Sequence, residues 1–537
     1  MISPFACCQP RRKHGLLALL WVAASLFPQV LPAHAQTTTS TIPFIYDFAS
    51  SNQAAIFLAP DAKKGMFHVS DPIGIQTTNG NPFRVLNTFG TVVCSATSTN
   101  IQLPCGHYFV ETDGDRMQFD VLPDDYAQCL LVGTASTGAW NVTDQLNALQ
   151  GPTWERSLLG MWTTVQPARG VWDWTGMDRV VAALQGTNRK LIYMAADTVP
   201  YWVGTNELID AYAQFTAAAL QRYGSQIYGW EIWNEPAYDK FGGTSPADAA
   251  RVFMGLATAA QSARKHVHSH VKLVGPSWSG PGIGIPESRI MVDNGILRIL
   301  DYWSFHDYTA GDYAPDQSYL NVYPISTRTK TNFGARVAKK PILITEGAFY
   351  GGSSLGIDVT SPWDSSLTKS SLTWYRGYCR TIKATIMYRA AGVTGIIPNL
   401  SGLFDTYPSS NWEIYTWDMS PWSPTSPPHP RGPHPKTTAF LMTSYWLNHA
   451  KGGRAMSIND QVYLYAWKRP KTGTVLFAWC VEGQTRTIGA LPGYRITDIY
   501  GHNINPGTLG EEPVMFRPIK GRSPQRAIKD VTAVLTN

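Results

Sequence analysis

Between residues 130 and 398, short apolar runs alternate with segments of helical period, and this alternation restricts the possible folds more than any other feature. Short apolar runs bounded by polar residues favour buried strands. Eight such runs predict strands, namely Leu130–Gly133, Leu158–Thr163, Lys190–Ala195, the run that begins at Ile227, Val271–Pro276, Tyr302–His306, Pro341–Glu346 and Gly395–Pro398. Helical segments fall between most of them, at Trp174–Leu184, Asp210–Tyr223, Pro246–His268 and Leu372–Ala390. This order predicts an α/β fold, a parallel (β/α)8 TIM barrel, although a doubly wound sheet fits the same pattern.

The segments on either side of this pattern alternate with a period of two and carry turn residues between short runs. Gly65–Val69 and Gly106–Val110 predict strands of a small sandwich, and Val462–Trp467 and Val475–Trp479 predict a second β domain. Ser420–Lys436 contains seven prolines and predicts an irregular insertion before a closing helix. We therefore divide the chain into a signal peptide, an N-terminal β-sandwich-like domain, a (β/α)8 barrel and a C-terminal β domain, over residues 1–35, 36–125, 126–450 and 451–537.

The N-terminus has the three parts of a removable signal peptide. A basic patch at Arg11–Lys13 precedes an apolar run from Leu16 to Val30, and Ala33-His34-Ala35 forms an A-x-A cleavage site before Gln36. Pro28 interrupts the apolar run, which is too short to cross a bilayer, so we expect export to the periplasm or the exterior without stable membrane insertion. Cleavage removes three positive charges from a formal net charge of +6. The nearly neutral remainder predicts no nucleic-acid partner.

Five cysteines follow the signal segment, at positions 94, 105, 129, 379 and 480. An odd number leaves at least one thiol without an intrachain partner. Cys94 and Cys105 lie on consecutive strand-like segments and could form a disulfide in an oxidising compartment. Neither C-x-x-C nor H-E-x-x-H occurs, so the sequence predicts no dedicated metal site and no cofactor.

Two glutamates end apolar runs of the barrel pattern. Glu235 follows Asn234 in I-Y-G-W-E-I-W-N-E-P, and Glu346 follows I-L-I-T. Because the C-terminal ends of barrel strands meet at one face, these carboxyl groups are expected to face each other. Cleavage of a glycosidic bond uses such a pair, one to protonate the leaving oxygen and one to attack or stabilise the sugar carbon. A lone glutamate at a strand end more often faces solvent or pairs with a basic neighbour.

Residues 130–450 resemble the retaining glycoside hydrolases of clan A. The motifs that carry the resemblance are W-N-E-P at Trp233–Pro236, T-E-G at Thr345–Gly347 and S-F-H-D-Y at Ser304–Tyr308. The segment from Arg156 to Asp178 adds the spacing of an arginine, Trp162, a Gln-Pro turn and an aromatic stretch. The layout is most similar to glycoside hydrolase family 39 and related bacterial exopolysaccharide glycosidases.

The resemblance implies a role for each matching residue. Glu235 would be the general acid/base, Glu346 the nucleophile, and Asn234 a hydrogen-bond partner of the sugar 2-hydroxyl. The further substrate-binding residues that it implies are Arg156, which would favour the ionised form of Glu346, Tyr308, which would donate to Glu346, and His306, which would line the same subsite.

Two tryptophans are predicted sugar-binding residues on weaker grounds. Trp202 lies on the loop after the third strand and could be a stacking platform. Enzymes of the clan usually carry a tryptophan near strand eight, but Gly395–Asn399 has none, so Trp412 or Trp417 from the next loop could replace it. Glu231, four residues before Glu235, is expected to point into the barrel interior.

These observations predict an exported retaining glycosidase that hydrolyses β-glycosidic bonds of a polysaccharide or oligosaccharide. Two other functions fit the same residues, a transglycosylase in exopolysaccharide assembly and a non-catalytic carbohydrate-binding protein. Xylan, glucan, mannan and bacterial exopolysaccharides all present faces that aromatic rings can cover, so the sequence does not select among them.

Overall fold

The computed structural model describes residues 56–59, 65–136, 152–307, 335–347, 373–398, 415–418 and 429–536, apart from interruptions of one or two residues. The predicted signal peptide, Tyr308 and Trp412 lie outside these ranges. Within the described part of the chain, no helix combines the length and apolarity that a membrane span requires.

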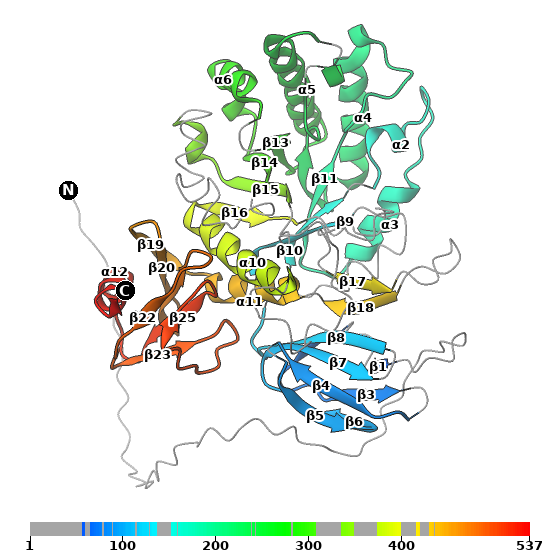
Figure 1. The fold of residues 1–537 in the computed structure, drawn as a ribbon. Helices are drawn as coiled ribbons and strands as arrows, with labels where there is room; N and C mark the ends of the chain where they lie inside the picture. Colours follow the sequence, from blue (N-terminus) through cyan, green and yellow to red (C-terminus); the bar gives the residue numbers. More distant parts are fainter. Residues whose placement is uncertain are drawn as a thin grey trace, which may run out of the picture. The chain divides into compact units, whose positions relative to one another are not determined.

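Eight parallel strands form a closed barrel at the centre of the chain (Figure 1). Each strand pairs with the next, and the last closes on the first through Ile396 and Val132. The strands are β9 (Cys129–Ser136), β10 (Pro152–Ser157), β11 (Lys190–Met194), β12 (Ile227–Glu231), β13 (Lys272–Trp278), β14 (Tyr302–Asp307), β15 (Ile342–Gly347) and β16 (Val393–Ile396). The predicted (β/α)8 fold is thus confirmed.

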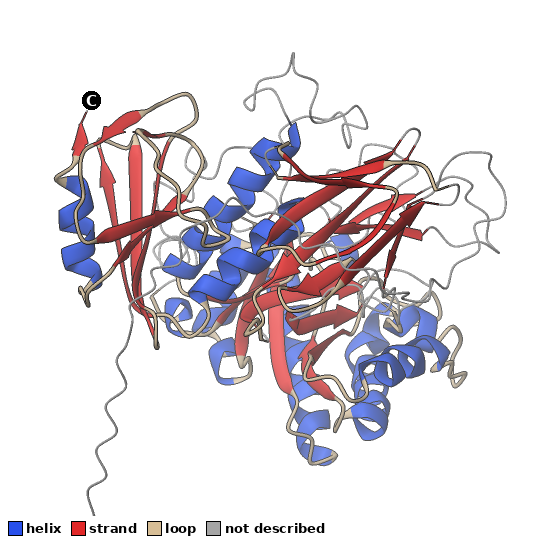
Figure 2. Cartoon of the chain, turned by 90° about the horizontal axis from the view of Figure 1, so that it is seen from below, coloured by secondary structure: helices blue, strands red, loops and turns tan. Residues whose placement is uncertain are grey.

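Helices follow most strands and cover the outside of the barrel (Figure 2). They are α2 (Trp162–Val165), α3 (Thr175–Leu184), α4 (Leu208–Tyr223), α5 (Pro246–His266), α6 (Ile285–Asp293), α10 (Thr373–Ala390) and α11 (Pro435–Leu447). In α5, Ser245 caps the N-terminus by accepting from the backbone N–H of Asp248, and Pro246 occupies the first turn, where its missing N–H costs nothing. Basic residues fill its last turn, where they favour the negative end of the helix dipole.

Two details of the predicted barrel strands are wrong. The second strand is Pro152–Ser157, and the predicted run Leu158–Thr163 instead leads into α2. Hydropathy misses this strand because Glu155 and Arg156 are polar, although both are fully buried. The fourth strand ends at Glu231, so Asn234 and Glu235 lie on the following loop and not on the strand itself.

The barrel interior has an apolar layer, and nearer the C-terminal ends of the strands it has a polar layer. Successive strand residues point to opposite faces, so residues two apart share the interior. Five buried residues from the ring contact one another as one interior cluster: Trp154, Ile192, Val274, Leu343 and Ile397. Two positions after Trp154 and Ile192 come Arg156 and Met194, which therefore form a second layer nearer the C-terminal ends of the strands. This alternation places a buried arginine directly above an apolar floor.

Before the barrel, a five-stranded mixed sheet and a three-stranded antiparallel sheet share one hydrophobic core and form a sandwich. The five-stranded sheet has the order β2-β8-β7-β4-β5, with β2 paired parallel to β8, and the three-stranded sheet has the order β1-β3-β6. The strands are β1 (Ile56–Ala59), β2 (Met66–His68), β3 (Ile73–Thr77), β4 (Phe83–Asn87), β5 (Val92–Ala96), β6 (Ser98–Ile101), β7 (Gly106–Thr112) and β8 (Asp115–Leu122). The N-terminal flanking β region is present, as predicted.

After the barrel, a second β region follows, with sheet orders β19-β20-β21-β25-β23 and β24-β22-β26. Its elements are β19 (Lys451–Ile458), β20 (Val462–Arg469), β21 (Gly473–Cys480), β22 (Arg486–Ile488), β23 (Tyr494–Thr497), β24 (Thr508–Leu509), β25 (Val514–Pro518), α12 (Pro524–Thr532) and β26 (Leu535–Thr536). Helix α12 packs on one side of the larger sheet through Ala527, Ile528 and Val531 (Figure 2). The C-terminal flanking β region is also present, as predicted.

The proline-rich segment contains regular structure that the sequence did not predict. Strand β18 (His429–Pro433) pairs with β17 (Tyr415–Asp418) in a two-stranded ribbon. Each strand of such a ribbon has an edge without a partner, where proline is tolerated because no ladder N–H is required.

None of the five cysteines after the signal segment forms a disulfide in this structure. Cys94 and Cys105, which the sequence allowed to pair, are therefore not joined, and Cys105 Sγ lies 3.7 Å from Met442 Sδ of α11. Burial raises the pKa of the Cys129 thiol to about 12, and burial also raises the pKa of Cys379 well above its ordinary value. These buried thiols are neutral at physiological pH and pack as small apolar groups.

The close packing of Gly395 against Trp154 predicts an effect on stability. An alanine Cβ at position 395 would lie 2.6 Å from Trp154 Nε1 and 2.9 Å from Leu343 Cδ2. Trp154 is 2% exposed, and its Nε1 donates to Leu130 O at 2.8 Å, so the ring cannot move aside. We expect Gly395→Ala to lower the free energy of unfolding by about 1–3 kcal/mol, measured by thermal or urea unfolding.

Gly204→Ala is the matched control. Gly204 has an ordinary φ of −73°, and its Cβ would meet no heavy atom within 4 Å. Its stability should stay within about 0.5 kcal/mol of the parent protein. Equal unfolding midpoints for the two variants would contradict the close packing inferred around Trp154.

Candidate active site

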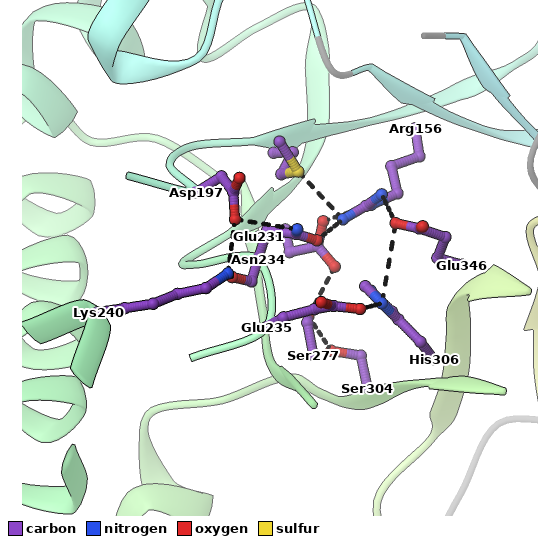
Figure 3. Close-up of polar contacts among 11 residues, drawn as sticks. Arg156, Asp197, Glu231, Asn234, Glu235, Lys240, Ser277, Ser304, His306 and Glu346 are labelled. Carbon is purple, nitrogen blue, oxygen red and sulfur yellow. Dashed lines mark hydrogen bonds and ion pairs between the residues drawn. The ribbon is translucent and has the colours of Figure 1, made fainter. Parts of the chain in front are cut away.

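The polar side chains predicted from the sequence meet at the C-terminal ends of the barrel strands (Figure 3). Arg156 belongs to β10, Glu231 ends β12, and His306 and Glu346 belong to β14 and β15. Asn234 and Glu235 lie on the loop after β12. The barrel therefore brings Arg156, Asn234, Glu235, His306 and Glu346 together from four strand ends.

Arg156 connects three of these groups. Its Nε donates to Glu231 Oε2 at 2.6 Å, its Nη1 donates to Glu346 Oε2 at 2.8 Å, and its Nη2 donates to Asn234 Oδ1 at 2.6 Å. The side chain of Arg156 is fully buried. Because guanidinium is a rigid planar fork, these contacts fix the relative positions of its partners as well as their distances.

Glu231 neutralises Arg156 from inside the barrel. It is fully buried, and its second oxygen accepts from Ser277 Oγ at 2.6 Å, while Ser277 Oγ and Ser304 Oγ lie 2.7 Å apart. A buried carboxylate is tolerated when it is paired and hydrogen-bonded, and both conditions hold here. The structure places Glu231 in the barrel interior, behind the groups that reach the mouth.

The two candidate carboxyl groups flank one histidine. His306 Nδ1 lies 2.7 Å from Glu235 Oε1 and 3.8 Å from Glu346 Oε2. The two oxygens can therefore be no farther apart than the sum of these distances, about 6.5 Å. Glu235 is 31% exposed and Glu346 is 15% exposed, whereas His306 is fully buried. Both carboxyl groups thus reach accessible space next to His306.

The surroundings of the two carboxyl groups differ in charge. Glu346 contacts the guanidinium of Arg156, and a nearby cation favours the ionised form of a carboxyl group. Glu235 contacts His306, and no lysine or arginine among the described residues lies within ion-pair distance of it. The site therefore holds one carboxylate beside a permanent cation and one carboxyl group without such a partner.

The backbone at Glu235 is left-handed, with φ of +48°, a conformation that non-glycine residues seldom adopt. Cross-strand hydrogen bonds maintain it: Asn234 N donates to Ala196 O at 2.7 Å, and Glu235 N donates to Ser277 O at 3.1 Å. Ser277 also has a positive φ, of +59°. Strain of this kind persists only where the surroundings determine it, and here it turns Glu235 toward His306.

Sequence reasoning missed Ser277, Asp197 and Lys240. Asn234 Nδ2 donates to Asp197 Oδ1 at 3.2 Å, and Lys240 Nζ donates to the same oxygen at 2.9 Å. Asp197 and Ser277 each stand at or just after the C-terminal end of a barrel strand. Examining every strand end for a polar residue would have selected these two, but nothing in the local sequence marks Lys240.

The predicted aromatic residues are placed only in part. Trp202 donates from Nε1 to Gln166 O at 2.9 Å, and the Arg169 guanidinium lies 5.1 Å from the centre of its ring. Trp202 stays a predicted sugar platform, with Arg169 over one of its faces. Tyr308 and Trp412 lie outside the described residues, and so does the side chain of Trp417.

Among the residues that the structure places, histidines, cysteines and carboxylates do not gather in any group of three that could hold a metal ion. The acidic residues of the site are instead paired with Arg156, Lys240 and His306. Proton transfer and carboxylate chemistry are the reactions that these side chains can perform themselves.

No protein-family model matches the chain. A conserved exported protein from Bacteroides fragilis is similar in structure, with a TM-score of 0.50 and 12% identity, over 74% of this chain and 99% of that one. SrfJ from Salmonella typhimurium has a TM-score of 0.47 and 12% identity, over 82% and 100% of the two chains. The catalytic domain of GH30 xylanase C from Talaromyces cellulolyticus has a TM-score of 0.45 and 14% identity, over 74% and 99%. At 12% identity, the likeness to the first of these structures is one of fold alone.

Arg156 generates a prediction about stability. Arg156→Met would leave Glu231 buried without its cation, and we expect a loss of about 3–5 kcal/mol in the free energy of unfolding. Arg156→Lys keeps the charge, but one ammonium group cannot reach Glu231, Glu346 and Asn234 together, so it should recover only part of the stability. Thermal unfolding measures both variants.

Arg169→Met is the matched control, because Arg169 pairs with Glu207 on the surface, where the two side chains are 63% and 52% exposed. Removal of an exposed pair should cost about 1 kcal/mol or less. If Arg156→Met were no less stable than Arg169→Met, the buried network would not have the importance assigned to it.

Proposed function

We propose that this protein is an exported retaining glycosidase that hydrolyses β-glycosidic bonds of a polysaccharide or oligosaccharide. The observation that supports this most is the pair of carboxyl groups, Glu235 and Glu346, on either side of His306, of which only Glu346 contacts a buried arginine. Export rests on the signal-peptide pattern of residues 1–35.

The spacing of the two groups favours retention over inversion. Retaining enzymes place the two carboxyl groups roughly 5–5.5 Å apart, whereas inverting enzymes leave roughly 6.5–9.5 Å for a water molecule. The upper limit of about 6.5 Å between Glu235 Oε1 and Glu346 Oε2 agrees with the shorter arrangement.

The first step forms a bond from Glu346 to the anomeric carbon while the bond from that carbon to the leaving oxygen breaks. Glu235 gives its proton to the leaving oxygen, so the departing group leaves as an alcohol. In the second step a water molecule attacks the same carbon, Glu235 takes a proton from the water, and the bond to Glu346 breaks. Each step inverts the anomeric carbon, and two inversions give net retention.

The charges of the site suit these roles. Arg156 keeps a charge on Glu346 before attack and stabilises it again as the carboxylate is released. Glu235 lies beside His306 and is accessible to the leaving group and to water. Asn234 precedes Glu235 in the sequence and shares Arg156 with Glu346, and the proposal assigns to it the contact with the sugar hydroxyl at carbon 2.

Retention is the first expected outcome. With a 2,4-dinitrophenyl β-glycoside that the mature protein cleaves, the first sugar product seen by proton NMR should be the β anomer. Glu346→Gln should lower kcat by about 10³-fold or more, because a carboxamide is too weak a nucleophile to form the covalent intermediate. An α anomer as the first product would contradict the mechanism, and transfer to an added sugar acceptor in place of water would identify a transglycosylase.

The leaving group distinguishes the acid from the nucleophile. Glu235→Gln should slow cleavage of an unactivated glycoside by about 10²–10⁴-fold, because the alcohol must leave with a proton. With a dinitrophenyl glycoside the first step needs no acid, so the variant should release a rapid burst of dinitrophenolate followed by slow turnover. Stopped-flow absorbance measures the burst.

Glu207→Gln is the control for this test, because Glu207 pairs with Arg169 on the surface and should behave like the parent protein with both substrates. A Glu235→Gln variant that lost activity equally on both substrates, without a burst, would show that Glu235 is not the acid.

A further inference from the structure

The side-chain amide of Asn234 is held at both ends (Figure 3). Arg156 Nη2 donates to its Oδ1 at 2.6 Å, and its Nδ2 donates to Asp197 Oδ1 at 3.2 Å. Arginine can only donate and an ionised carboxylate can only accept, so these partners assign the oxygen and the nitrogen of the amide. One contact fixes the position of the amide oxygen, and the second fixes the plane of the group. The direction of the other Nδ2 hydrogen is therefore set by Asp197.

Asp197 is held in turn by Lys240, which belongs to a short 3-10 helix, η3 (Asp239–Phe241). Lys240 Nζ lies 2.9 Å from Asp197 Oδ1 and 3.4 Å from the backbone oxygen of Asn234. The ammonium group neutralises Asp197 and ties the loop that carries Asn234 and Glu235 to the end of β11. Without this cation, the charge of Asp197 would stand uncompensated beside the catalytic carboxyl groups.

Stability of the fold does not explain this pair well. Asp197 and Lys240 are 37% and 34% exposed, and ion pairs at such accessible positions contribute little to folding. Both side chains instead contact Asn234, which precedes Glu235 in the sequence and accepts a hydrogen bond from Arg156. This favours a role in orienting Asn234.

We propose that the Lys240–Asp197 pair is a positioning element that aims the second Nδ2 hydrogen of Asn234 at the sugar, so that the site selects glycosides with an unsubstituted hydroxyl at carbon 2. This inference rests on the proposed function, because it concerns the same site. Asp197 acts through Asn234 and does not touch the bond that breaks.

The contact with the 2-hydroxyl strengthens in the transition state, because the ring flattens and positive charge develops at the anomeric carbon. An amide that points in the wrong direction loses this gain while it still permits the substrate to bind. Removal of Asp197 should therefore lower kcat more than it raises KM.

The test compares two substrates that differ only at carbon 2. A panel of 2,4-dinitrophenyl β-glycosides first identifies one that the parent protein hydrolyses, and its 2-deoxy analogue is then prepared. The values of kcat and KM are measured on both for the parent, Asp197→Ala, Asp197→Asn, Asn234→Ala and the double variant Asp197→Ala/Asn234→Ala. Thermal unfolding confirms that each variant is folded, and Asp293→Ala, which removes an exposed surface aspartate, is the control.

We expect Asp197→Ala to lower kcat/KM by about tenfold to a hundredfold on the hydroxylated substrate, as a small misplacement at a reacting centre can do. On the 2-deoxy substrate the loss should be about threefold or less, because the contact is already missing. Asp197→Asn should recover most of the activity, since its amide oxygen can still accept from Nδ2. In the double variant, Asp197→Ala should add little to the loss caused by Asn234→Ala.

Equal losses on the two substrates, or fully additive losses in the double variant, would overturn the inference and leave the proposed function intact. If the parent protein released dinitrophenolate from no glycoside of the panel, the proposed function would fail and the inference with it. A loss of folding in Asp197→Ala but not in Asp197→Asn would assign the pair a structural role and would also overturn the inference.

Discussion

A buried guanidinium inside a barrel is the constraint on which the rest of this site depends. Arg156 is fully removed from solvent, and a buried charge is stable only if counter-charges and hydrogen-bond acceptors surround it. Glu231 supplies the buried counter-charge, and Glu346, Asn234 and Met194 accept further hydrogen bonds from the guanidinium. The positions of Glu346 and Asn234 at the barrel mouth therefore depend on how the buried charge of Arg156 is compensated. Because the guanidinium is rigid and planar, it also fixes the relative positions of the groups that accept from it.

The closed barrel brings these residues together although they lie far apart in the sequence. Arg156 follows Trp154 by two positions, so the period of the strand alone places the arginine above the apolar floor. By the same period, His306 lies on the same face of β14 as Ser304, two residues before it. Parallel pairing then aligns the C-terminal ends of neighbouring strands, and residues 190 positions apart, Arg156 and Glu346, come within hydrogen-bond distance.

Much of the fold and the central pair of carboxyl groups could be predicted from the sequence, because apolar runs that end in a glutamate are visible without a structure. Strand β10 was misplaced because its interior residues are a tryptophan and an arginine, which do not form an apolar run. Strand β19 was missed because it is almost wholly exposed, so no hydrophobic pattern marks it. The left-handed turn at Glu235 and the partners of Asn234 depend on loops that meet only in three dimensions. Ser277, Asp197 and Lys240 are polar residues in loops or at strand ends, where local sequence does not distinguish an inward side chain from a solvated one.

The formal charges of the side chains at the site do not cancel, and their sum bears on the reaction that the site can favour. Arg156 contributes one positive charge, Glu231 and Glu346 contribute two negative charges, and Asp197 and Lys240 compensate each other. Apart from Glu235, which the proposed mechanism uses as the acid, this set carries one net negative charge, and its accessible part is the carboxylate of Glu346. In the proposed reaction, glycoside cleavage develops positive charge on the sugar ring, so a fixed negative charge on Glu346 would stabilise the transition state more than the neutral substrate. Glu231 is part of this balance, because without it the formal charges of Arg156 and Glu346 would sum to zero.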